Sequence, residues 1–116
     1  MNTLFILNDA PYGSERSYNA LRLAGTLSKE EGEEVKVFLI GDAVVCAKAG
    51  QKVPEGFYNV ELMLRRVVRN SGEVGVCGSC IDARAITEAE IIDVSHKSSL
   101  AELTSWTQWA HKVIAF

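Results

Sequence analysis

The stretch TLFILN, residues Thr3–Asn8, holds four apolar side chains in succession. A strand with one solvated face alternates apolar and polar residues. An unbroken apolar run instead predicts a strand buried on both faces, as in a parallel sheet between helices. The pattern recurs at Lys36–Gly41 (KVFLIG), Val74–Val76 and Val113–Phe116, so we predict four buried strands. A weaker apolar run at Ile92–Val94 predicts a short fifth strand, after a short helix.

The segments between these strands show the period of amphipathic helices. Residues 14–31 and 99–112 carry apolar side chains at i, i+3, i+4 and i+7, and residues 58–70 extend this spacing to i+8. The stripes are Ala20, Leu23, Ala24 and Leu27; Val60, Met63, Leu64, Val67 and Val68; and Leu103, Trp106, Thr107 and Ala110. Ser99 and Glu102 match a capping box. The alternation predicts one three-layer α/β/α domain over residues 1–116, with a mostly parallel sheet of four or five strands.

The composition excludes several classes of function. The chain has a net charge of −3 and scattered basic residues, so it lacks the electrostatic footprint of a nucleic-acid-binding protein. The N-terminus has no basic segment typical of an export signal, and no apolar stretch approaches the length of a membrane span. Three cysteines, an odd number, fit free thiols in a reducing compartment. We expect a cytoplasmic protein with no membrane contact, no bound metal and no cofactor.

The predicted topology gathers all three cysteines at one edge of the sheet. The loops at the carboxyl ends of parallel strands lie along the same edge, where open α/β folds place their sites. In this chain those loops are Asp9–Ser14, Asp42–Cys46, Cys77–Cys80 and Val94–Ser98. His96 belongs to the last of them. These segments therefore contain the candidate site.

The loop VCGSC, residues 76–80, favours a reactive sulfur. Cys77 ends a strand and a short helix starts near Cys80, so the helix amides and dipole favour a thiolate over a thiol. Gly78 permits a sharp turn and leaves its amide accessible. Arg84 adds a positive charge if it folds back. We take Gly78, Ser79 and Arg84 as binding residues around the sulfur.

Four interpretations of the two thiols remain open on chemistry alone. They are small buried residues in a turn, half of a zinc site completed by Cys46 and His96, a redox pair in the manner of thioredoxin, or a sulfur carrier. The zinc site lacks a second Cys-x-x-Cys pair, and no proline or aromatic residue flanks the motif as in thioredoxin. The chemistry of the loop alone does not distinguish a redox pair from a sulfur carrier.

The chain resembles the DsrE-like family of sulfur relay proteins, and within it the YchN-like branch. The resemblance runs through four segments: NDAPYGSERSYNALRLA, GDAVVCAKAGQ, VCGSCIDAR and LAELTSWTQWAHKVIAF. The PYG turn and the Cys-Gly-Ser-Cys-x-x-Ala-Arg loop are the most specific pieces. The family usually closes this loop with Arg-Gly, where the present chain has Arg84-Ala85. If the backbone there has a positive φ, alanine is strained.

The resemblance implies a function. Cys77 matches the cysteine that carries persulfide sulfur in TusD-type members, and Cys80 is the additional cysteine of the YchN-like branch, a resolving or assisting thiol. The family also implies a homo-oligomer, a trimer or hexamer, with sulfur donor and acceptor proteins as partners. The alternatives are an oligomeric binding or assembly module with inert thiols, and a redox protein that uses both cysteines.

Other residues at this sheet edge have less specific roles. Gly13 and Ser14 suit a turn and a helix N-cap, and their amides could bind an anionic sulfur donor or a phosphate. His96 is a candidate proton shuttle for Cys77 or an exposed loop residue without a role. Cys46 is expected to be a buried small residue, and Asp42 a helix cap.

Overall fold

The computed structural model describes residues 1–116 and has a five-stranded, wholly parallel sheet. The strand order is β4-β3-β2-β1-β5. The strands are β1 (Asn2–Leu7), β2 (Glu34–Leu39), β3 (Glu73–Cys77), β4 (Ser95–Ser98) and β5 (Lys112–Ala115). The expected class of fold, α/β with a parallel sheet, is confirmed.

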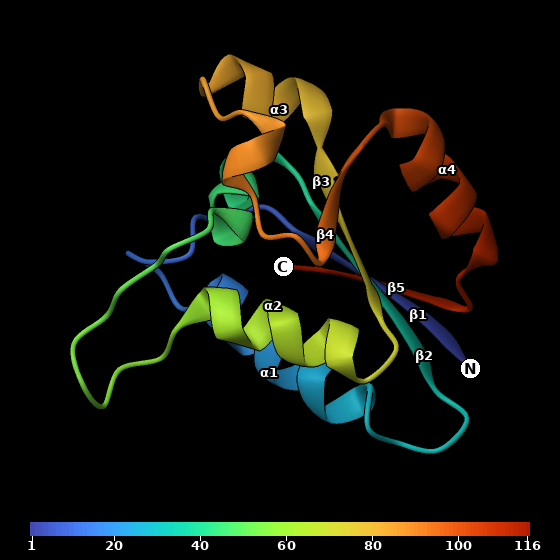
Figure 1. Cartoon of the computed structure of the whole chain (residues 1–116). Helices are drawn as coiled ribbons and strands as arrows, with labels where there is room; N and C mark the ends of the chain where they lie inside the picture. The colour runs from blue at the N-terminus through green and yellow to red at the C-terminus, as the bar shows by residue number, and fades with distance from the viewer.

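Helices cover both faces of this sheet and its carboxyl edge (Figure 1). The helices are α1 (Arg16–Leu27), α2 (Val60–Arg69), α3 (Gly78–Ala83) and α4 (Leu100–Trp109), with the short 3₁₀ helices η1 (Gly41–Ala47) and η2 (Glu88–Glu90). Helices α1 and α2 lie side by side on one face, α4 lies on the other, and α3 follows β3 at the carboxyl edge. None of these helices is long and apolar enough to span a bilayer.

The hydrophobic core lies on both sides of the sheet. The larger part, beneath α1 and α2, includes Phe5, Leu7 and Val37, all fully buried. The smaller part, beneath α4, is formed by Leu4, Phe38 and Trp106. Because β1 and β2 send successive side chains into opposite parts of the core, their apolar runs are continuous, as the sequence predicted.

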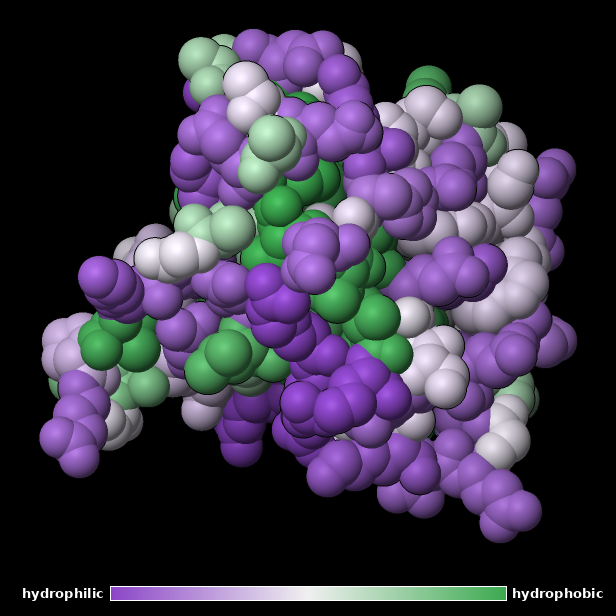
Figure 2. Space-filling model, in the orientation of Figure 1, coloured by the Kyte–Doolittle hydropathy of each residue, from purple (hydrophilic) through white to green (hydrophobic).

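Strand β5 departs from that expectation. It pairs only with β1, at the edge of the sheet, and it leaves Val113 48% exposed. Elsewhere on the molecule, apolar residues reach the surface in a central band with hydrophilic residues around it (Figure 2).

The prediction of a strand at Ile92–Val94 is wrong. The fifth strand is Ser95–Ser98, four polar residues that pair in parallel with β3. It is an edge strand held by backbone hydrogen bonds and mostly exposed, so it carries no apolar pattern. Ile92 is buried, but its backbone amide donates to the carbonyl of Ala47 instead of joining a sheet.

Two helix predictions also need correction. In α1, Leu21 enters the core while Leu23, assigned to the buried stripe, is 44% exposed. At the start of α4, Ser99 Oγ accepts a hydrogen bond from the amide of Glu102, which is half of the predicted capping box. The carboxylate of Glu102 bonds instead to His96 and Ser98, so the reciprocal half is absent.

Thr3 offers a test of the packing beneath α1. Its side chain is fully buried, and Oγ1 has no hydrogen-bond partner. Replacing an unpaired buried hydroxyl by a methyl of the same shape removes its desolvation cost. We expect Thr3→Val to raise the free energy of unfolding by about 1 kcal/mol in urea titrations. Thr104→Val is the control, because the Thr104 hydroxyl is exposed and already donates to the carbonyl of Leu100; equal gains in both would contradict the argument.

Candidate functional site

Cys77 is the last residue of β3 and the N-cap of α3, so its sulfur stands where the strand turns into the helix. The turn is tight because Gly78 passes close to β4. A Cβ added at Gly78 would lie 2.9 Å from both Lys97 Cε and the carbonyl oxygen of Ser98. Only glycine fits this approach, which fixes the direction of the amides that follow.

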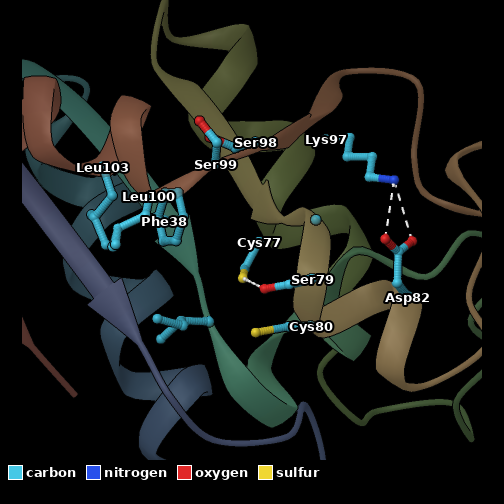
Figure 3. Close-up of a pocket in the computed structure, with 12 residues that line it drawn as sticks. Phe38, Cys77, Ser79, Cys80, Asp82, Lys97, Ser98, Ser99, Leu100 and Leu103 are labelled. Atoms are coloured by element: carbon cyan, nitrogen blue, oxygen red, sulfur yellow. Dashed lines mark hydrogen bonds and ion pairs between the residues drawn. The ribbon is translucent and has the colours of Figure 1, made fainter.

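The groups after Cys77 turn back toward its sulfur (Figure 3). The Ser79 hydroxyl oxygen lies 3.4 Å from Cys77 Sγ. Burial alone would raise the pKa of Cys77, but hydrogen bonds from the side chains and amides of Cys80 and Ser79 outweigh it. The pKa of Cys77 therefore lies below that of an ordinary cysteine. This is the direction predicted from the position of Cys77 before a helix.

Cys80 has the opposite character. Burial raises the pKa of Cys80, and its hydrogen bond to Cys77 raises it further. The amide of Gly41, which donates to Cys80 Sγ at 3.3 Å, and the charge of Arg84 offset only part of this rise. Of the two thiols, Cys77 is therefore the one that loses its proton more readily, and Cys80 is the one that donates to it.

A pocket of about 510 Å³ opens beside Cys77. Its wall joins the carboxyl ends of β2 and β3, the first turn of α3, and the start of α4. The lining residues are Phe38, Ile40, Cys77, Gly78, Ser79, Cys80, Asp82, Lys97, Ser98, Ser99, Leu100 and Leu103. Both thiols of the loop therefore face the same hollow, and both are only half-buried.

Arg84 does fold back toward the loop, but it bonds to oxygen atoms. Its Nη1 donates to the carbonyl of Cys80 at 3.0 Å, and its Nη2 donates to Asp42 Oδ1 at 2.8 Å. Asp42 was expected to cap η1, yet it lies inside that helix and pairs with Arg84 instead. The guanidinium thus ties α3 to η1 and acts on Cys80 through its charge.

Ala85, which stands where the family usually has glycine, has a φ of 55°. The strain expected from the sequence is therefore present. Relief of this strain by Ala85→Gly should raise the free energy of unfolding by about 1 kcal/mol, less the extra entropy that glycine gives the unfolded chain. Ala83→Gly, two residues earlier at the end of α3, should lower it. Urea titrations of both variants test the sign, and a loss in each would contradict strain at Ala85.

His96 lies on β4, on the strand and not in a loop. Its Nε2 pairs with Glu102 Oε1, and its ring meets the edge of Trp106 with 5.9 Å between ring centroids. It does not line the Cys77 pocket. The structure therefore gives His96 a packing role, and nothing in it brings the imidazole to the thiols.

Gly13 and Ser14 line a different, smaller hollow of about 240 Å³. The Ser14 hydroxyl donates to Asp9 Oδ2 at 2.8 Å and accepts from the amide of Arg16, the first residue of α1, at 3.4 Å. Ser14 therefore bonds to the start of α1 as expected, although the N-cap position itself is Glu15. Asp9 and Asp42 place two carboxylates in the same hollow. This site stays separate from Cys77, and its carboxylates do not favour an anion.

Cys46 is the buried small residue that the sequence predicted. It is fully buried in η1, its Sγ lies 3.7 Å from the carbonyl of Asp9, and burial raises its pKa to about 12. No three His, Cys, Asp or Glu side chains are placed to hold a metal ion. Cys46 and His96 therefore do not complete a zinc site with the loop thiols.

Lys97 and Asp82, which were not among the residues predicted for the site, line the pocket and form an ion pair at 3.2 Å. Asp82 lies on α3 and Lys97 on β4, and their meeting depends on where the edge strand runs. The pairing of Cys77 with Ser98 in the sheet register places Lys97 beside the loop. Correct assignment of that strand would have identified both residues.

Fold and pocket together define a small parallel α/β protein with a half-buried thiol at the end of its third strand, open to a pocket. The chain belongs to the DsrE/DsrF-like family, whose model matches residues 1–116. It is 40% identical over 114 residues to the protein YchN of Escherichia coli strain K12, with 97% of each chain covered. It is 39% identical over 111 residues to the uncharacterized protein MK0008 of Methanopyrus kandleri, covering 96% of this chain and 90% of that one.

Solved structures agree with this assignment. The crystal structure of YchN from E. coli superposes with a TM-score of 0.92 at 39% identity, over 99% of this chain and 98% of that one. A protein of unknown function, MTH1491 from Methanobacterium thermoautotrophicum, shares the fold with a TM-score of 0.74 at 8% identity, again over 99% and 98% of the two chains. The expected membership of the family, close to YchN, is confirmed.

Proposed function

We propose that this protein is a sulfur carrier in which Cys77 accepts sulfane sulfur as a persulfide and passes it to the next thiol. The observation that carries the proposal is the half-buried Cys77 sulfur, open to a pocket and hydrogen-bonded by Ser79 and Cys80 so that its pKa is lowered. A thiolate is the form that attacks sulfane sulfur. Membership of a family associated with sulfur relay supports the same role.

Peptide mass spectrometry after incubation with inorganic polysulfide tests this proposal. Trypsin places both loop thiols on one peptide, Asn70–Arg84, and Cys46 on another, so fragmentation must locate the added mass. One extra sulfur on Cys77 is the expected result. An unmodified protein, under conditions that load a small free thiol, would favour the binding module with inert thiols.

A second candidate function is dithiol redox chemistry. Its support is that the pKa of Cys77 is lowered while the pKa of Cys80, three residues later, is raised. A thiol that ionises readily beside one that keeps its proton is the arrangement that thiol–disulfide exchange uses. This candidate predicts a reversible Cys77–Cys80 disulfide under mild oxidant. If a disulfide is the only product and no persulfide is found on Cys77, redox chemistry replaces sulfur carriage.

We also propose a reducing, cytoplasmic setting and a homo-oligomer, a trimer or hexamer, that exchanges sulfur with donor and acceptor proteins. The three unpaired cysteines support the reducing setting. Large apolar side chains exposed on the single chain, Phe57 at 69% and Val113 at 48%, support association. Light scattering should give the mass of three or six chains, and a monomer at micromolar concentration would contradict it.

A further inference from the structure

The pocket beside Cys77 is much larger than an inorganic sulfur donor requires. Its volume is about 510 Å³. A water molecule in the liquid has a share of about 30 Å³, so sulfide or a short polysulfide fills only a small part of the space. Pockets for organic ligands generally measure about 300–1,000 Å³. The hollow therefore has room for an organic group attached to the sulfur.

One side of the pocket is apolar. Phe38, Leu100 and Leu103 gather on the same side of Cys77 (Figure 3). Phe38 is anchored in the core at 1% exposed, whereas Leu100 stands at the start of α4 with 74% of its surface in water. An apolar substituent against this wall would remove Leu100 from water, which favours binding.

Two further lining residues, Lys97 and Ser99, offer donors that suit oxygen. Lys97 is the single cation among the lining residues, and the exposed Asp82 holds it at 3.2 Å. The Ser99 hydroxyl accepts from the amide of Glu102, which leaves its own hydrogen free to donate. An ammonium and a hydroxyl solvate anionic oxygen atoms better than they solvate sulfur.

Resting on the proposed function, we infer that this pocket takes an organic thiosulfonate, in which a sulfane sulfur is attached to a sulfonyl group with an apolar substituent. The Cys77 thiolate attacks the sulfane sulfur, a new S–S bond forms, and the bond from sulfane sulfur to sulfonyl sulfur breaks. The electron pair leaves with the sulfonyl group as a sulfinate, and Cys77 keeps a persulfide anion. Charge and atoms balance without an external oxidant or reductant. The apolar substituent lies on the leucine wall and the sulfonyl oxygens face Lys97 and Ser99.

The size of the apolar substituent gives the first test. Benzenethiosulfonate and methanethiosulfonate carry the same charge and differ in the apolar group. The second-order rate constant for loading of Cys77 is measured with each compound. It is then divided by the rate constant of the same compound with a small free thiol, which corrects for the intrinsic reactivity of the compound. We expect a preference of about tenfold for the benzene compound, the factor for half-burying a phenyl ring.

Substitutions in the apolar wall test whether the preference for the benzene compound arises there. Leu100→Ser and Leu103→Ala should each reduce it by at least about half, because each removes part of the apolar wall. Leu62→Ser is the matched control, since Leu62 is 61% exposed on α2, away from the pocket. It should leave the preference unchanged. Leu100 is exposed, so its substitution tests the wall even if Leu103→Ala weakens the fold.

Charge at the rim gives the second test. Lys97→Met should slow loading by both thiosulfonates about threefold at low salt, and Asp82→Asn should speed it by a similar factor. Lys29→Met is the control, because Lys29 lies just after the end of α1 and does not line the pocket. Alkylation by iodoacetamide, a neutral reagent, should change little in any of these variants, because the thiolate itself is unaltered.

The outcomes separate this inference from the proposed function. If inorganic polysulfide loads Cys77 but the two thiosulfonates load it equally after normalisation, the sulfur-carrier function stands and the organic donor is wrong. A preference that survives Leu100→Ser and Leu103→Ala also overturns the assigned wall. If no donor loads Cys77, both proposals fail.

Discussion

The Cys77→Ser protein is expected to accept no sulfane sulfur, whereas loss of the Cys80 sulfur should only slow acceptance. Serine is not deprotonated near neutral pH, and the remaining free thiols are poor substitutes. Cys46 is fully buried with a pKa of about 12, and Cys80 is the thiol whose pKa is raised. Loading of the Cys77→Ser protein should therefore fall to background in peptide mass spectrometry. Loading equal to that of the unmodified chain would remove Cys77 from the mechanism.

The pH profile of alkylation distinguishes the role of Cys80. Its thiol donates to the Cys77 sulfur and lowers the pKa of Cys77, so Cys80→Ala should raise that pKa. The thiolate fraction at a fixed pH falls as the pKa rises, so the reaction should slow by about three- to tenfold near pH 7 and recover at high pH. Cys80→Ser should recover part of the loss, because a hydroxyl also donates. An unchanged profile in Cys80→Ala would show that Cys80 does not act on Cys77.

The central strands could be predicted because each contributes to both parts of the core. Leu4 and Phe5 point to opposite faces and are both fully buried, so consecutive residues of the strand are apolar and the strand can be recognised from the sequence. Strand β4 carries no such pattern. It consists of Ser-His-Lys-Ser at the edge of the sheet, and its position follows from backbone pairing with β3, which side-chain hydropathy does not encode.

The same difference limits the prediction of the site. The turn at Cys77 could be foreseen because a strand, a glycine and a helix start adjoin in sequence. The strain at Ala85 could be foreseen because alanine replaces a glycine usual in the family. The pocket wall could not, because Phe38, Lys97 and Leu103 come from three elements and meet only through the packing of α4 and the register of β4.

Alanine at Gly78 is expected to weaken both the fold and the thiol, whereas alanine at Gly72 should weaken only the fold. A Cβ at Gly78 would lie 2.9 Å from the carbonyl oxygen of Ser98, which the pairing of β3 with β4 holds in place. A Cβ at Gly72 would lie 2.6 Å from Val67 Cγ1 and 2.9 Å from the carbonyl oxygen of Val35. Each overlap should cost about 1–3 kcal/mol of unfolding free energy, measured in urea.

Only the substitution at Gly78 displaces groups that face the sulfur. The chain there must shift away from β4, and the Ser79 hydroxyl and the following amides move with it, so the Cys77 thiolate loses hydrogen bonds. Alkylation of Cys77 near pH 7 should slow by about tenfold in Gly78→Ala and remain unchanged in Gly72→Ala, at a temperature where both are folded. Equal slowing in both would assign the loss to general destabilisation. Unchanged reactivity in Gly78→Ala, despite lost stability, would show that the close approach of α3 to β4 does not position the groups that activate the sulfur.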